Sequence, residues 1–192
     1  MNNTFKIILG SAFAAAVAFY ASYIIGDTYH GGFLVLAAVF GAYMAMNIGT
    51  NNVANNVVPA VGSGALTIGG AILIASIFEA AGVLIAGGDV VGTIKKGIID
   101  PAAFGGAPMI FVYAMSAALL AAALWLNLAT WFKAPVSTAH SIVGGVLGGG
   151  IASGGFAIVS WATMGKIASS WIISPVLCGV IAAVFYVIKG FN

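Results

Sequence analysis

Charged side chains are too few along this chain to cover a water-facing surface. The 192 residues include six Lys and four acidic residues, so 5% of residues are charged and 62% are hydrophobic. A soluble domain usually has about 25% charged residues, because its surface faces water. The surface of the folded chain must therefore be solvated by lipid, and we predict a multi-pass protein of the cell (inner or plasma) membrane. The formal net charge of +2 is too small to predict a nucleic-acid partner.

Six stretches are long and apolar enough to cross, or nearly cross, a bilayer, which takes about 20 helical residues. These stretches are about 5–25, 31–50, 65–87, 108–132, 136–152 and 167–189. Irregular backbone cannot face lipid, so the segments are predicted to be helices. The predicted fold is an all-α integral membrane protein in which some helices are interrupted or re-entrant. It forms a single domain over 1–192, with an additional N-terminal helix at about 5–25 and a core at about 31–189. The most polar predicted loop runs from Gly87 to Pro101 and contains Lys95 and Lys96.

Five asparagines lie within residues 47–56. On a helix Asn47, Asn51 and Asn55 would share one face, but Asn is a poor residue for a helix interior and Pro59 follows closely. We therefore predict an interrupted helix lining a polar cavity, where transporters place substrate and coupling-ion sites. Each Asn offers two N–H donors to an oxyanion and one carbonyl to a hard cation. The alternative is hydrogen bonding between helices, which fits one or two Asn better than five.

A second polar stretch spans residues 134–141 and leads into a glycine-rich run. Pro135 suits the first turn of a helix, and a helix N-terminus is a natural anion site. The hydroxyls of its first two turns would belong to Ser137, Thr138 and Ser141. The alternative is an N-cap followed by close helix packing through Gly144 and Gly148, a small-xxx-small pair. This segment alone leaves both interpretations open.

Two titratable residues stand inside apolar surroundings. Glu79 lies in the middle of a predicted span, where an ionised side chain is expensive and often functional, as a cation ligand or proton site. A neutral, hydrogen-bonded packing role is the alternative. His140 could titrate near neutrality or donate to an anion, although a hydrogen bond between helices explains it equally well.

Enzyme functions lack the necessary residues. The sequence has no paired-carboxylate site, no metal-ligand spacing and no phosphate-binding Walker loop. We therefore predict a non-enzyme without catalytic residues and without a cofactor.

Four separated motifs resemble those of the PiT family of inorganic phosphate transporters, also called the phosphate permease family. Gly49–Asn56 matches the family's Gly-Ala-Asn-Asp-Val-Ala-Asn signature, and Val58–Ala65 matches its continuation. Phe78-Glu79 matches a Phe-Glu or Cys-Glu pair in the next helix, and Pro135–Ser141 matches Pro-Val-Ser-Thr-Thr-His-Ser. The order and spacing of these motifs cover most of residues 31–189.

The resemblance implies transport of inorganic phosphate coupled to Na⁺ or H⁺. In that family two such halves, inverted in the membrane, enclose one phosphate site. The resemblance implies contacts to phosphate or the ion from Asn51, Asn52, Asn55, Ser137, Thr138 and Ser141. It also implies a cation-coupling role near Asn52 and Glu79, with Na⁺ as the only metal ion.

This sequence departs from the family pattern at four positions. Asn52 replaces the signature Asp, Val58 a Gly, Gly64 a Lys and Ala139 a Thr. The chain also matches one family half, so we expect a half-transporter that needs a second half, from an antiparallel homodimer or a separate subunit. The alternatives are a sulfate permease and a non-transporting, degenerate membrane subunit.

Overall fold

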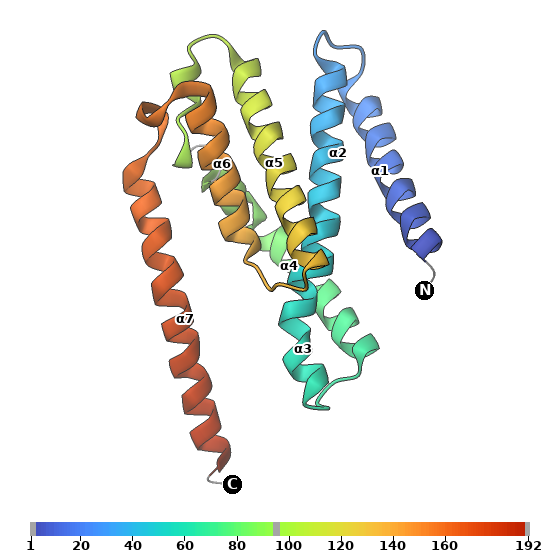
Figure 1. Cartoon of the computed structure of the whole chain (residues 1–192), viewed down its shortest axis with the longest axis vertical. Coiled ribbons are helices and arrows are strands. Elements are labelled where there is room, and N and C mark those ends of the chain that lie inside the picture. The colour runs from blue at the N-terminus through green and yellow to red at the C-terminus, as the bar shows by residue number, and fades with distance from the viewer. Residues whose placement is uncertain (1–2, 94–96, 191–192) are drawn as a thin grey trace.

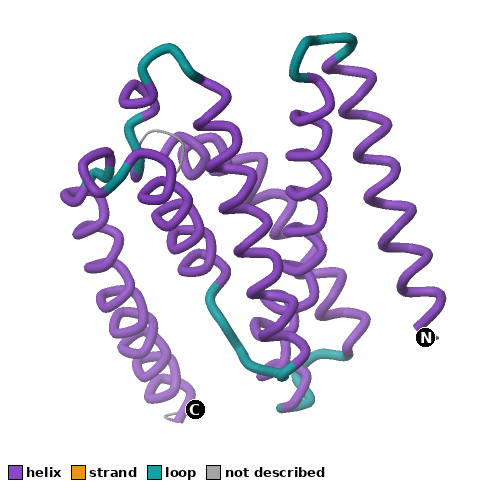
Figure 2. Tube along the Cα trace, turned by 45° about the horizontal axis from the view of Figure 1, so that its top comes forward, coloured by secondary structure: helices purple, strands orange, loops and turns teal. Residues whose placement is uncertain are grey.

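The computed structural model describes residues 3–93 and 97–190, almost all of them helical (Figure 1). Lys95 and Lys96, which the sequence analysis places in a polar loop, lie outside the described residues. The α-helices are α1 (Asn3–Ile25), α2 (Gly31–Ile48), α3 (Ala54–Gly62), α4 (Ile68–Thr93), α5 (Pro108–Trp131), α6 (Thr138–Gly154) and α7 (Trp161–Gly190). The π-helical segment η1 (Gly49–Val53) joins α2 to α3, and short 3₁₀ helices η3 (Pro101–Phe104) and η4 (Phe156–Ile158) precede α5 and α7. Helices account for most of the trace in Figure 2.

Five helical segments of the described chain are long and apolar enough to cross a membrane. They are Thr4–Ile25, Gly31–Gly62, Ile68–Asp89, Pro108–Trp131 and Trp161–Gly190. The prediction of an all-helical, multi-pass membrane protein is confirmed. Three predicted boundaries move: α4 continues past Gly87 to Thr93, the second segment stays helical through η1 and α3, and α7 begins at Trp161 and not at about 167. The first two of these segments remain helical although they contain glycine or asparagine, because a backbone in lipid must make its hydrogen bonds internally.

Helices α5 and α6 pack closely against each other. A Cβ on Gly145 would lie 2.7 Å from the carbonyl oxygen of Ala118, and one on Gly149 would lie 2.7 Å from that of Ala114. Only glycine allows the two backbones to approach this closely, as is common between membrane helices. The predicted packing pair, Gly144 and Gly148, has nothing within 4 Å of its Cβ positions. The prediction was wrong by one residue, since α6 carries glycine pairs on adjacent faces and only packing selects one.

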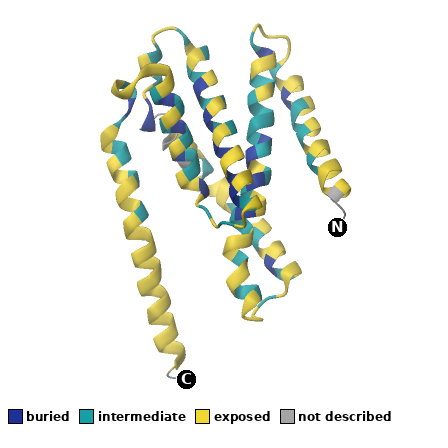
Figure 3. Ribbon diagram, in the orientation of Figure 1, coloured by how far each residue is buried: buried dark blue, intermediate teal, exposed yellow. Residues whose placement is uncertain are grey.

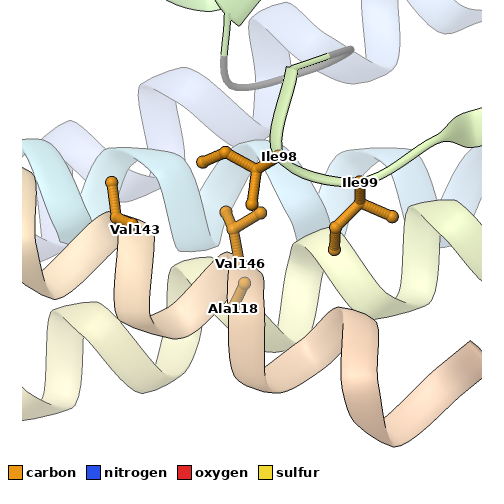
Figure 4. Packing of buried hydrophobic residues seen from close by; sticks show 5 residues of the cluster. All are labelled: Ile98, Ile99, Ala118, Val143 and Val146. Atoms are coloured by element: carbon orange, nitrogen blue, oxygen red, sulfur yellow. The ribbon is translucent and has the colours of Figure 1, made fainter. Parts of the chain in front are cut away.

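A hydrophobic cluster covers one side of this helix pair (Figure 4). Its buried members are Ile98, Ile99, Ala118, Val143 and Val146. A single antiparallel bridge between Ile99 and Val159 ties the loop before α5 to the loop before α7. The Asp100 N–H donates to the Ile158 carbonyl at 3.2 Å, and the Ser160 N–H donates to the Ile98 carbonyl at 2.9 Å. These contacts fix the position of α6 against α5.

Two helices leave the packed bundle of α1, α2, α5 and α6. Helix α7 has no buried residue, and from Ile172 to Gly190 every residue is exposed (Figure 3). Among the α4 residues whose burial is described, only Ala71 is buried. Large apolar side chains on both helices therefore face away from the rest of the described chain, including Leu84 at 86% and Ile172 at 71% exposure.

Candidate functional site

The asparagine-rich segment is interrupted by a π-helical turn and does not unwind. The Asn47 amide donates to the Tyr43 carbonyl at 2.8 Å, and the Thr50 hydroxyl donates to the Asn47 carbonyl at 3.1 Å. Side chains that bond the helix's own carbonyls compete with the backbone ladder, and a single π turn in an α-helix is frequent at functional sites. The predicted interruption is thus present at Gly49–Val53, while the carbonyls expected to be freed stay in a helical backbone.

Asn51 joins the two polar segments that the sequence analysis singled out. Its side chain is buried, with 5% of its surface exposed. Its amide nitrogen donates to the Thr130 hydroxyl at 3.1 Å and to the Ala134 carbonyl at 3.3 Å. Its amide oxygen accepts a hydrogen bond from Asn55 at 3.1 Å. The structure therefore brings η1 against the segment that leads into α6.

A tight backbone corner ends α5 and starts the second polar segment. The Ala134 N–H donates to the Ala129 carbonyl at 2.8 Å, and the Lys133 N–H donates to the Thr130 carbonyl at 3.0 Å. This pair of bonds is the Schellman motif, which normally places glycine in the left-handed position. Here Lys133 occupies that position, with φ 57°. The chain then runs without helical structure until α6 begins at Thr138, so the prediction that Pro135 lies in the first helical turn was wrong. Proline follows a helix end here because it cannot continue the helix.

Ser137 is the N-cap of α6. Its hydroxyl accepts from the His140 N–H at 3.3 Å, and its carbonyl accepts from the Ser141 hydroxyl at 2.8 Å. Thus the N-cap interpretation holds at Ser137, and it does not exclude a ligand, because the side chain is exposed. A cavity of about 400 Å³ is lined here by Trp125, Val136, Ser137, His140 and Ser141.

Thr138 and His140 differ in their surroundings. The Thr138 hydroxyl is buried, and no partner for it lies in the described part of the chain. The His140 ring packs against Trp171 of α7 in a tilted arrangement, with 3.9 Å between ring centroids and 32° between ring planes. A buried hydroxyl without a partner is costly in a protein interior. Thr138 is therefore the polar group at this end of α6 that gains most from an added partner.

The remaining predicted residues differ in their exposure. Asn52 is half-buried in η1, and Asn55 is exposed one turn further on. Glu79 is exposed on α4, a helix that contacts α3. No group of three His, Cys, Asp or Glu that could hold a metal ion occurs among the described residues.

The sequence analysis missed Thr130. It is one hydroxyl near the end of a long apolar helix, and its own hydrogen bond goes to the Leu126 carbonyl at 2.8 Å, as is usual for threonine in such helices. Only its distance from Asn51 in space shows that it belongs to the site. One departure from the family pattern has a structural explanation. Gly64, which stands where the family has Lys, adopts φ 76°, a conformation that favours glycine.

Comparison with known proteins identifies relatives for most of the chain. The model of the phosphate transporter family matches residues 48–191. A Helicobacter pylori protein named "Putative phosphate permease" is 50% identical over 184 residues, which are 96% of this chain and 34% of that protein. A chloroplastic inorganic phosphate transporter of Arabidopsis thaliana is 43% identical over 148 residues, which are 77% of this chain and 25% of that protein.

The fold is also similar to a solved structure. The structure titled "The sodium-dependent phosphate transporter" aligns with a TM-score of 0.73 at 40% identity. The alignment covers 81% of this chain and 38% of that one. This chain therefore spans about a third of the length of the curated relatives and of the solved structure that it matches.

Proposed function

This chain belongs to the phosphate transporter family, and we propose that it carries inorganic phosphate across the cell membrane, coupled to Na⁺ or H⁺, as one half of a transport unit. The observation that carries the proposal is the contact of η1 with the segment before α6 through Asn51. That contact brings an amide-rich segment beside a helix N-terminus, which together form a neutral donor set for an oxyanion. Neutral donors can replace the water around phosphate without holding the anion too tightly to release it.

The proposed contacts to phosphate or the coupling ion come from both segments. The contacts from η1 and the start of α3 are Asn51, Asn52 and Asn55. The contacts from the start of α6 are Ser137, Thr138 and Ser141. Ser137 and Ser141 line a cavity, and the Thr138 hydroxyl is available for a partner. Both amide hydrogens of Asn51 already donate within the protein, so Asn51 can contact only the coupling cation, through its oxygen.

The exposure of Glu79 supports the requirement for a second half. The faces of α4 and α7 that turn away from the bundle are apolar, and Glu79 lies exposed on α4. A carboxylate in a membrane span normally faces protein or a water-filled cavity. We propose that a second half, from another copy of the chain or a separate subunit, covers these faces and encloses Glu79, which then serves with Asn52 in cation coupling.

Gradient-driven uptake of radiolabelled phosphate into proteoliposomes tests the proposal. Uptake should depend on an imposed Na⁺ or H⁺ gradient and fall at least tenfold in Ser137→Ala, because an anion contact at the α6 N-terminus is lost. The matched control is Ser153→Ala at the other end of the same helix, where the hydroxyl bonds only the Gly149 and Gly150 carbonyls. Unlabelled sulfate should not compete; competition by sulfate would indicate a sulfate permease instead.

A second candidate is a membrane subunit of the same family that no longer transports. The observation that favours it is Asn52, which stands where the family has Asp. An amide oxygen can bind a cation but contributes no negative charge. Asn52→Asp separates the two candidates, since uptake that appears only in this variant would show that the present chain has lost transport.

A further inference from the structure

We propose that Asn51 and Thr130 form a clamp that positions the segment before α6, and that Thr130 is a positioning residue for phosphate binding. This inference rests on the proposed function. Thr130 belongs to no predicted motif, yet its hydroxyl accepts a hydrogen bond from the buried Asn51 amide at 3.1 Å. The same amide nitrogen donates to the Ala134 carbonyl at 3.3 Å.

The orientation of the Asn51 amide follows from its partners. The Ala134 carbonyl can only accept a hydrogen bond, so the nitrogen of the Asn51 amide must face it. Its oxygen then faces the Asn55 amide, which donates at 3.1 Å. In the reversed orientation the Asn51 oxygen would face the Ala134 carbonyl oxygen, and the Asn51 nitrogen would face the Asn55 amide nitrogen. The Asn51 side chain is thus committed to holding three neighbours.

Thr130 completes this arrangement because its hydroxyl serves two partners at once. It donates to the Leu126 carbonyl at 2.8 Å, which turns its oxygen lone pairs toward Asn51. Donation to one group strengthens acceptance from another in a hydrogen-bond chain. Valine has the same shape without the oxygen, so Thr130→Val would leave one Asn51 hydrogen without a partner.

The clamp acts at the corner that sets the path into α6. It bonds two residues of the Schellman motif, namely Thr130 in the last helical turn and Ala134 just after the left-handed Lys133. Only Pro135 and Val136 separate Ala134 from the N-cap of α6, Ser137. This amide therefore helps to set the distance between η1 and the first turn of α6, and a phosphate ion held between the two segments needs that distance to be constant.

Distance measurement between the two segments tests the clamp without relying on transport. Spin labels on Asn56→Cys and Ala139→Cys would report it, because both positions are exposed. The natural thiol of Cys178, which is also exposed, is replaced by serine. Pulsed electron paramagnetic resonance should show a narrow distance distribution in the labelled protein that keeps Thr130 and in its Thr130→Ser variant. The distribution should be broader in the Thr130→Val variant. The matched control is Ser116→Ala on the same helix, which removes a bond to the Val112 carbonyl and no contact with η1.

Phosphate uptake by the same variants, without labels, gives the functional result. The KM for inorganic phosphate should rise about tenfold in Thr130→Val, as expected for one lost buried hydrogen bond. It should return to within about twofold of the original value in Thr130→Ser, with the maximal rate changed less than the KM. If Thr130→Val does not yield folded protein, Asn51→Asp is used, because it keeps the oxygen for Asn55 and removes both amide hydrogens.

The outcomes separate this inference from the proposed function. An unchanged distance distribution in Thr130→Val, or no recovery in Thr130→Ser, would overturn the clamp even if the chain transports phosphate. A broadened distribution in a chain that shows no uptake under any gradient, alone or with a second half of the same family, would support the clamp and reject the proposed function. Broadening together with a raised KM supports both.

Discussion

The two polar segments of this protein contain similar side chains but use them differently. In η1 the buried amide of Asn51 makes hydrogen bonds through both its nitrogen and its oxygen. At the start of α6 the buried hydroxyl of Thr138 makes none within the described chain. Polar groups that already have partners hold a fold together, whereas an unpaired buried group has most to gain from a ligand. The comparison therefore assigns a holding role to Asn51 and leaves the Thr138 hydroxyl open to a ligand.

The two segments also differ in how they are kept in place. Side-chain hydrogen bonds from η1 cross to the end of α5. The segment before α6 is held by the Asn51–Ala134 hydrogen bond and also by a backbone corner at Lys133 and the close contact of α6 with α5 through Gly145 and Gly149. Substitutions at these points test the comparison.

The largest effect is expected at the helix contact. Gly149→Val places carbon against the Ala114 backbone oxygen, which cannot move aside, and should lower stability by about 3 kcal/mol. Thermal unfolding in detergent measures this. Gly148→Val is the matched control, because nothing lies within 4 Å of its Cβ position, and equal losses in the two variants would show that the helices do not pack as described.

The next effect is expected at Asn51. Asn51→Leu leaves the Ala134 carbonyl and the Asn55 amide without their partner and should cost about 2 kcal/mol. The control is Asn56→Leu, since Asn56 is exposed and its replacement should change the unfolding free energy by less than about 0.5 kcal/mol. An Asn51 variant as stable as the original protein would contradict the holding role of η1.

An effect of opposite sign is expected at Thr138. Thr138→Val removes the unpaired hydroxyl at nearly constant volume, so the protein without phosphate should gain about 1–2 kcal/mol. The stabilisation caused by added phosphate, measured as a rise in Tm, should shrink in the same variant. Loss of stability without phosphate, or an unchanged phosphate response, would remove Thr138 from the binding segment.

The smallest effect is expected at Lys133. Lys133→Gly relieves a left-handed backbone conformation and should add about 1 kcal/mol to the unfolding free energy. Chemical or thermal unfolding of detergent-solubilised protein measures it. Lys133→Ala controls for the loss of charge, because alanine keeps the Cβ and the strain; equal gains from both variants would attribute the effect to the charge instead.

Much of the architecture was predictable because lipid imposes strong constraints on a chain. Long apolar stretches with few charges must be helical, and the structure confirms helices at 3–25, 31–48 and 108–131. The family motifs led to the correct family, since matches at separated positions are specific. The predicted site residues themselves stay a prediction, although the structure brings Asn51 and the segment before α6 together.

Other features depended on which face of a helix packs against its neighbour, or on contacts between residues far apart in the chain. Hydropathy is nearly uniform around α6, so it could not distinguish the face of Gly144 from that of Gly145. The π turn at η1 arises from competition between side chains and backbone that is too local for helix periodicity to show.

The sequence by itself determined that this protein is helical, lies in a membrane and belongs to the phosphate transporter family, because composition and motif order suffice for those conclusions. Only the tertiary structure decided which polar groups are already paired. That distinction depends on contacts such as the one between Asn51 and Thr130. The two residues are 79 positions apart in the chain, and 3.1 Å separates the Asn51 amide nitrogen from the Thr130 hydroxyl oxygen. Hydrogen bonding acts over a few ångströms, so the role of each polar side chain follows from its neighbours in the fold.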